Sequence, residues 1–162
     1  MTDPTSLGHW VRRFLLQYAA SERNLSPNTR ASYRDMLVLL LPYVAKRKRA
    51  AVDTLAVTDL SAEVVRTFLV YLENERQCST ATRNQRLGSI HALARFIGAH
   101  SPQHVEWCAQ VRMVPSRRGA LPASPTWRSR RSMRCLPLPI DRRAKEHAIT
   151  LAAVPFTTLV RV

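Results

Sequence analysis

Apolar residues recur at steps of three and four through most of the first 113 residues, which is the spacing of one face of an α-helix. The pattern predicts an all-α fold, a small bundle of four to five helices, because no segment alternates in the manner of a strand. The predicted helices cover about residues 6–21 and 27–45, begin at Ser61 and at Ser79 or Thr80, and end with a short segment over 103–111. The apolar positions are Leu7, Trp10, Val11, Phe14, Tyr18, Tyr33, Met36, Leu37, Leu40, Val44, Val64, Val65, Phe68, Leu69, Leu72, Leu87, Ile90, Ala94 and Ile97.

The second predicted helix carries an arginine where its apolar face begins. Ser26 is a good N-cap and Pro27 suits the first helical position. Arg30 lies on the line that continues as Tyr33 and Leu37, at a position where a helix that only packs would carry leucine. We therefore expect this helix to be buried along its C-terminal part and polar at its N-terminal end.

The fourth predicted helix repeats this arrangement, because its apolar line runs from Leu87 toward the N-terminus into Arg86 and Arg83. The adjoining face carries Asn84, Gly88, His91 and Arg95. A polar N-terminal end presents backbone N–H groups and a positive dipole to a phosphate, while amide and imidazole groups can reach base edges. The alternative is that these are ordinary solvated first-turn residues, and each helix taken alone favours that alternative.

Charge makes a nucleic acid the leading partner. The 162 residues hold 25 Lys+Arg and 11 Asp+Glu, a net charge of +14. The run KRKR at 46–49 complements the C-terminal dipole of the second helix, and four cations in a row also suit phosphate contacts. The N-terminus does not resemble a signal peptide, and the run MLVLLL is too short to span a bilayer. We therefore expect a cytoplasmic protein that binds no membrane.

Composition changes near residue 113. Residues 114–162 are rich in Arg and Pro and show no sustained apolar periodicity, which predicts an irregular basic C-terminal tail beside a folded domain over 1–113. The tail is either disordered or an out-of-frame remnant.

Three cysteines, Cys78, Cys108 and Cys135, form no CxxC pair and are interpreted as reduced thiols. No metal site, cofactor or small-molecule substrate is expected.

Two segments resemble a known family. "LSPNTRASYRDML", followed some fifty residues later by "STATRNQRLGSIHALARFI", is similar to the N-terminal, SAM-like core-binding domain of tyrosine site-specific recombinases of the phage-integrase type. "DLSAEVVRTFLVYL" resembles the third helix of that domain, and "HSPQHVEW" resembles the link after it. The resemblance extends over roughly residues 6–118 and is best over 6–101. The matching positions are Ser26, Thr29, Tyr33, Thr82, Asn84, Arg86, Leu87, Ile90 and Phe96.

The resemblance implies one half of a clamp around double-stranded DNA, with the second and fourth helices facing the major groove. Intact recombinase subunits are then further candidate partners. Taken with the positions of the basic residues, it predicts DNA contacts from Arg30, Arg34, Lys46, Lys48, Thr82, Arg83, Asn84, Gln85, Arg86 and His91.

The catalytic domain that the family requires is not recognisable in the sequence. Its tyrosine nucleophile attacks the scissile phosphodiester while cationic residues stabilise the transition state. The tyrosines here all lie at or before residue 71, and the single His-x-x-Arg match, "HWVR" at 9–12, falls far upstream of where that motif belongs. We therefore expect no enzyme activity and no catalytic residues, and hypothesise a truncated or frameshifted recombinase that still binds DNA.

Two other functions remain open. One is a standalone regulator that competes with an intact integrase for its sites. The other is a basic helical RNA-binding protein, although RNA readers display accessible stacking aromatics. Here Trp10, Phe14, Tyr18, Tyr33 and Phe68 lie on the apolar faces instead.

Overall fold

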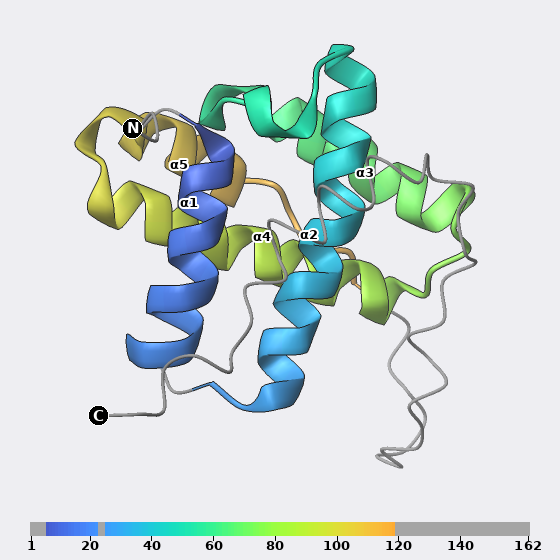
Figure 1. Ribbon diagram of the computed structural model, residues 1–162. Coiled ribbons are helices and arrows are strands. Elements are labelled where there is room, and N and C mark those ends of the chain that lie inside the picture. The colour runs from blue at the N-terminus through green and yellow to red at the C-terminus, as the bar shows by residue number, and fades with distance from the viewer. Residues whose placement is uncertain (1–5, 23–24, 119–162) are drawn as a thin grey trace. The chain divides into compact units, whose positions relative to one another are not determined.

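The computed structural model describes residues 6–22 and 25–118, and these fold into helices (Figure 1). The predicted tail from residue 119 onward lies outside the described residues, as does Cys135. Within the described residues no strand forms beyond one isolated antiparallel bridge between Ser6 and Ala56. The elements in chain order are α1 (Leu7–Arg13), the π-helical η1 (Phe14–Glu22), α2 (Pro27–Lys48), the 3₁₀ turns η2 (Val52–Thr54) and η3 (Val57–Asp59), α3 (Ala62–Asn74), α4 (Thr80–His100), the 3₁₀ turn η4 (Pro102–His104) and α5 (Val105–Arg112).

Serine caps begin three of these helices at the predicted positions. Ser26, Ser61 and Ser79 each accept a hydrogen bond from the backbone N–H three residues further on, at 3.3, 3.3 and 3.2 Å. Each cap satisfies one of the N–H groups that the first helical turn leaves without a partner. The all-α prediction and the starts of α2, α3 and α4 are thereby confirmed.

The other end of α2 lies three residues beyond the predicted one. Arg49 adopts a left-handed conformation with φ 52°, and its N–H donates to the carbonyl of Lys46 at 3.4 Å. The N–H of Ala50 donates to the carbonyl of Ala45 at 3.1 Å. This pair of bonds is a Schellman closure, which satisfies the last carbonyls and carries the helix through the basic run.

The described residues divide into two compact units. The first comprises residues 6–22 and 25–59, in which α2 packs against η1 and η2. Phe14 is fully buried, and its ring lies 5.3 Å from that of Tyr18 and 5.1 Å from that of Tyr33. The predicted single α-helix over 6–21 is wrong in one respect, since it is α-helical through Arg13 and π-helical from Phe14.

The second unit, residues 60–118, is organised around α4, which packs against α3, α5 and η4. The predicted apolar line of α4 is confirmed, because Leu87, Ile90, Ala94 and Ile97 are all buried. The indole Nε1–H of the buried Trp107 donates to the carbonyl of Leu60 at 2.8 Å, which fixes α5 to the start of this unit.

The cysteine prediction holds for only one of the two described cysteines. Cys108 is a free, buried thiol on α5. Cys78 is disulfide-bonded, so the expectation that all three cysteines are reduced is wrong.

We expect Gly98→Ala to lower the free energy of unfolding by about 1–3 kcal/mol, measured by urea denaturation. A methyl carbon at Gly98 would lie 2.8 Å from Cys108 Cβ and 2.9 Å from its Sγ, so α5 would have to move. Gly88→Ala is the matched control on the same helix, because an added carbon there meets nothing within 4 Å. Removing a glycine from a helix interior should stabilise that variant by about 0.5–1 kcal/mol. Equal stability of the two variants would contradict this packing.

Candidate nucleic-acid interface

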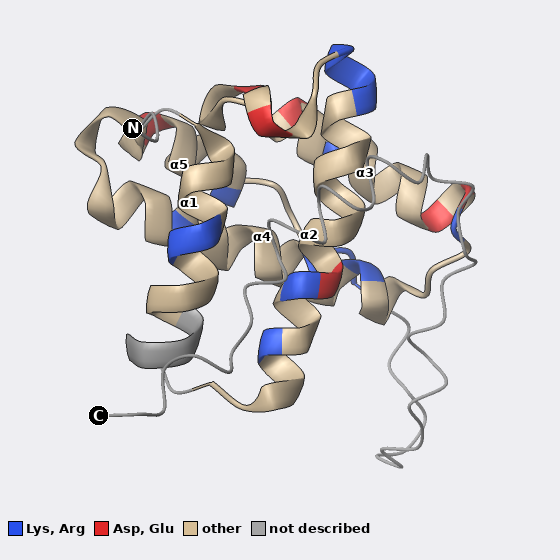
Figure 2. Ribbon diagram, viewed as in Figure 1, with Lys and Arg blue, Asp and Glu red and all other residues tan. Residues whose placement is uncertain are grey.

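The predicted basic residues of α2 fall into two groups at its two ends (Figure 2). Arg34 is exposed and Arg30 is half-buried in the first turns, whereas Lys46 and Lys48 are exposed in the last. At 1.5 Å per residue, Arg30 and Lys46 lie about 24 Å apart along the helix. Lys48 is engaged by Asp59, with Nζ 3.1 Å from Oδ1. The structure therefore does not gather these four residues at one point, and a single phosphate cannot contact both groups.

The first turn of α4 is less exposed than the sequence predicts. Thr82 and Arg83 are buried, at 4% and 8% exposure. Thr82 binds the capping serine, with Ser79 Oγ 3.0 Å from Thr82 Oγ1. Arg83 is drawn inward by a carboxylate on α3, because its Nε lies 3.8 Å from Glu73 Oε1. The prediction that this end of the helix is simply polar and open is therefore wrong at these two positions.

Asn84 holds the chain that follows α5. Its Nδ2 donates to the carbonyl of Arg117 at 2.6 Å, and its Oδ1 accepts from the N–H of Arg117 at 3.0 Å. Arg117 Nη1 also lies 3.1 Å from Glu73 Oε1, and Arg83 Nη1 donates to the carbonyl of Pro115 at 3.3 Å. We call residues 115–117 with these contacts the clasp. Asn84 therefore uses both ends of its amide inside the protein, which the prediction of a base contact did not anticipate.

A line of four residues one turn apart follows on the solvent side of α4, namely Asn84, Gly88, His91 and Arg95; we call it the α4 strip. Gly88 and Arg95 are exposed, and His91 is half-buried. Gln85 is exposed, and Arg86 is half-buried on the line that continues as Ile90 and Ile97, away from the strip. The predicted site residues of α4 thus separate into two buried first-turn positions and a more open group that follows.

Burial is the main cause that lowers the pKa of His91 below its ordinary value. The backbone carbonyl of Val111 on α5 acts in the opposite direction, and Arg112 and Arg95 lower the pKa further. The lowered pKa favours the neutral form of the His91 ring. Arg112 was not among the predicted contacts, since only the packing of α5 on α4 brings it close to His91.

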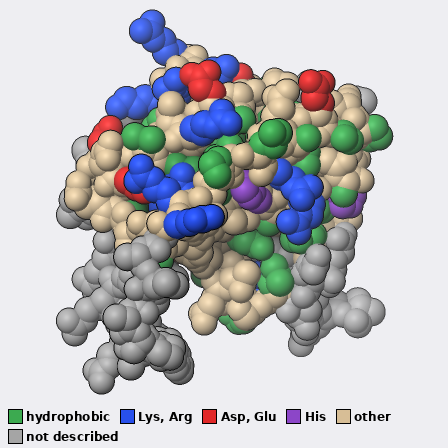
Figure 3. Space-filling model, turned by 180° about the vertical axis from the view of Figure 1, so that it is seen from behind, with side chains coloured by type: hydrophobic (Ala, Val, Ile, Leu, Met, Phe, Trp, Pro, Cys, Tyr) green, Lys and Arg blue, Asp and Glu red, His purple; other side chains and the backbone are tan. Residues whose placement is uncertain are grey.

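Basic side chains (blue) and a histidine (purple) lie on the face shown in Figure 3. Within the described ranges, the ion pairs of the second unit are those of Glu73 with Arg83 and Arg117. Arg95 and Arg112 are exposed and form no ion pair there. In this part of α4 and α5 the two arginines are therefore available to an anion, while Glu106 lies at the other end of α5.

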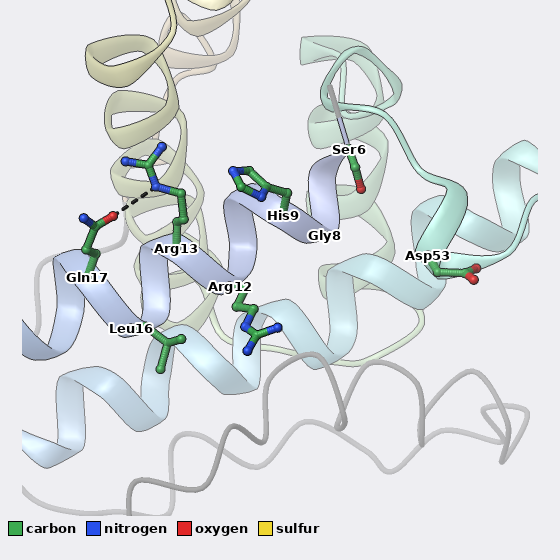
Figure 4. A pocket seen from close by; sticks show the side chains of 8 residues that line it. All are labelled: Ser6, Gly8, His9, Arg12, Arg13, Leu16, Gln17 and Asp53. Atoms are coloured by element: carbon green, nitrogen blue, oxygen red, sulfur yellow. Dashed lines mark hydrogen bonds between the residues drawn. The ribbon is translucent and has the colours of Figure 1, made fainter. Parts of the chain in front are cut away.

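The His-x-x-Arg match lies in the first unit beside a cavity of about 540 Å³ (Figure 4). His9 and Arg12 both line it but point in different directions. Arg13 is held by Gln17, to which its Nε donates at 3.0 Å. The structure thus shows no joint site for His9 and Arg12. In the part of the chain that the structure describes, no cluster of three or more His, Cys, Asp or Glu residues is arranged to hold a metal ion.

Comparison with known proteins assigns the helical part to a family domain. Residues 11–100 match the family described as phage integrase, N-terminal SAM-like domain. Two proteins of Sinorhizobium fredii that are named as integrase/recombinase, y4rC and y4rD, are 34% and 30% identical to the chain over 118 residues, or 73% of its length. The chain spans only 36% and 42% of the lengths of these relatives. No solved structure matches the chain.

Among the described helices, none is both long and apolar enough to cross a membrane.

We expect Asn84→Ala to release the clasp, because the N–H and carbonyl of Arg117 both lose their partner. Hydrogen exchange of the Arg117 amide, followed by NMR, should become faster in this variant. Asn84→Asp is the matched control, since a carboxylate still accepts from the Arg117 N–H but cannot donate to its carbonyl. Its exchange rate should lie between those of the wild type and the alanine variant. Unchanged protection in Asn84→Ala would show that other contacts hold this segment.

Proposed function

Because the chain belongs to the phage integrase family through its N-terminal SAM-like domain, we propose that it binds double-stranded DNA. The observation that carries the proposal is the division of α4 into two sides. Leu87, Ile90 and Ile97 are buried on one side, while Gly88, His91 and Arg95 of the α4 strip lie on the other. A helix held in this way presents cations to a polyanion without unfolding its own core.

The proposed contacts are mostly to the phosphate backbone. On α4, Arg86 neutralises a phosphate. On α2, Arg30 and Arg34 lie near the start of the helix and contact phosphates there. Lys46 and Lys48 contact other phosphates, because they lie at the far end of α2. Contacts of this kind set position and affinity and carry little sequence information. Gln85 is an exposed residue of α4, and we assign a contact with a base edge to its side-chain amide.

Thr82, Arg83 and Asn84 take a different role in this proposal. They shape the start of α4 and hold the clasp, and a contact from Asn84 to DNA would first have to break its two hydrogen bonds to Arg117. The buried guanidinium of Arg83 likewise stays with Glu73.

The proposal assigns binding, and not strand cleavage, to residues 1–162. Tyr18, Tyr33, Tyr43 and Tyr71 are the tyrosines of the sequence, and all lie in η1, α2 and α3. Phe14 packs against two of them, Tyr18 and Tyr33, as part of the first unit. A covalent adduct between this chain and a nicked duplex would contradict the assignment. Binding to recombination sites in the cytoplasm, in competition with intact recombinase subunits, is the cellular role that follows.

A salt titration of fluorescence anisotropy on a short duplex tests the proposal. We expect a dissociation constant on the order of micromolar at moderate salt, because a single half-clamp makes few phosphate contacts. Arg86→Ala should weaken binding to all duplexes similarly and lower the salt slope by roughly one unit.

Arg66→Ala is the matched control, since it removes an exposed arginine of the same unit from α3 instead of α4. Its affinity and slope should equal those of the wild type. Leu87→Ala, at a side chain only 1% exposed, should cost about 2–5 kcal/mol of stability and so report what a folding defect does to binding. If Arg86→Ala binds like the wild type while the fold is intact, α4 is not the DNA-facing helix.

A further inference from the structure

We propose that His91, Arg95 and Arg112 form a phosphate clamp across α4 and α5, with Gly88 as the point where the DNA backbone lies directly on α4. This inference rests on the proposed function and adds to it a specific anion site, a close-approach position and a dependence on pH. The three side chains of the clamp come from two helices that pack together, so the fold itself holds them in place.

The geometry of the clamp follows from helix spacing and from the packing of α5. His91 and Arg95 are one turn apart on α4, and Arg112 lies in the last turn of α5. Both guanidinium groups are close enough to act on the imidazole of His91. The Nε2 atom of His91 is buried and makes no hydrogen bond within the described residues. The clamp thus combines two exposed guanidinium groups with a half-buried imidazole, which acts on the bound phosphate through its charge when protonated.

The charges around the clamp are of one sign. Arg95 on α4 and Arg112 on α5 are the charged groups that act on His91. On the other elements packed against α4, Glu73 of α3 is bound by Arg83 and Arg117, and His104 of η4 binds Ser101 through Nδ1 at 2.8 Å. Glu106, in the first turn of α5, accepts a hydrogen bond from Gln110 at 3.4 Å. No described carboxylate forms an ion pair with either guanidinium group, so an anion that binds between them gains from both charges. A phosphodiester, which carries a single negative charge and accepts several hydrogen bonds, has the chemistry that such a site recognises.

Gly88 lies three residues before His91, and packing gives no reason for a glycine there. It is exposed, and an added Cβ would meet nothing within 4 Å. A glycine inside a helix is less stable than an alanine, because it loses more conformational freedom on folding. Gly98 on the same helix has a packing reason in the contact with Cys108, which Gly88 lacks. A close approach by the partner's backbone accounts for the missing side chain.

Binding at this clamp should take up a proton. In the free protein, burial and then the charges of Arg112 and Arg95 lower the pKa of His91, which favours the neutral ring. A bound phosphate adds an opposite charge and raises that pKa, so the complex holds a proton that the free protein lacks. Affinity should therefore rise as the pH falls through the bound-state pKa, and level off below the lowered free-state pKa. For one proton the steepest gain is about tenfold per pH unit.

The test is fluorescence anisotropy of the full chain on a duplex of about 20 base pairs at constant ionic strength, from about pH 8 to pH 5.5. The wild type should bind more tightly as the pH falls. His91→Gln should lose this gain. Arg112→Ala should weaken binding at every pH, lower the salt slope by roughly one unit and reduce the gain. Gly88→Ala should weaken binding several-fold although it stabilises the fold, and Arg66→Ala should behave as the wild type.

The outcomes separate the two proposals. If the wild type binds no duplex at any pH, the proposed function fails and the clamp fails with it. If the wild type binds, but His91→Gln keeps the full pH dependence and both Arg112→Ala and Gly88→Ala bind like the wild type, the clamp is wrong while DNA binding stands. Circular dichroism of each variant identifies a loss of binding that comes from unfolding, and the variants that keep their helices then decide the result.

Discussion

The close contact between Gly98 on α4 and Cys108 on α5 determines which side of α4 is left to solvent. Because Gly98 has no side chain, α4 and α5 pack so closely that even a methyl group at this position would collide with Cys108. The apolar line of α4 is then covered, and the end of α5, with Val111 and Arg112, is brought close to His91, which lies two turns before Gly98 on the same face of α4. The basic surface of the second unit is thus a consequence of how its core packs, because neither helix alone would place these charges together.

Glu73 has a comparable organising role at the other end of α4. One carboxylate attracts the guanidinium groups of both Arg83 and Arg117, and Asn84 secures the backbone of Arg117 from the other side. The carboxylate lowers the cost of burying Arg83, since an unpaired buried charge is costly. The consequence for function is a division of labour along α4, in which the first turn serves the fold and the clasp and the later turns are available to a ligand.

How far the sequence predicts this arrangement depends on the range of the interactions involved. Serine caps such as Ser79 and apolar lines such as that through Leu87 are local patterns, so they correctly give the starts of three helices and the buried side of α4. The burial of Arg83 depends on a carboxylate on another helix, and the role of Asn84 depends on a segment about thirty residues away. No periodicity within α4 carries that information. For the same reason the sequence identified His91 as a candidate but not Arg112 as its neighbour.

The central claim is that the solvent side of α4, from Gly88 to Arg95 with Arg112 beside it, is where the chain meets duplex DNA. The most direct measurement is a ¹H–¹⁵N NMR titration of the labelled full chain with a duplex of about 20 base pairs, a length that covers about two helical turns. The account predicts that the largest chemical-shift changes fall on the amides of Gly88, His91, Arg95 and Arg112, with smaller changes on the buried side of α4. Saturable binding that leaves these four amides unshifted while other helices respond would contradict it.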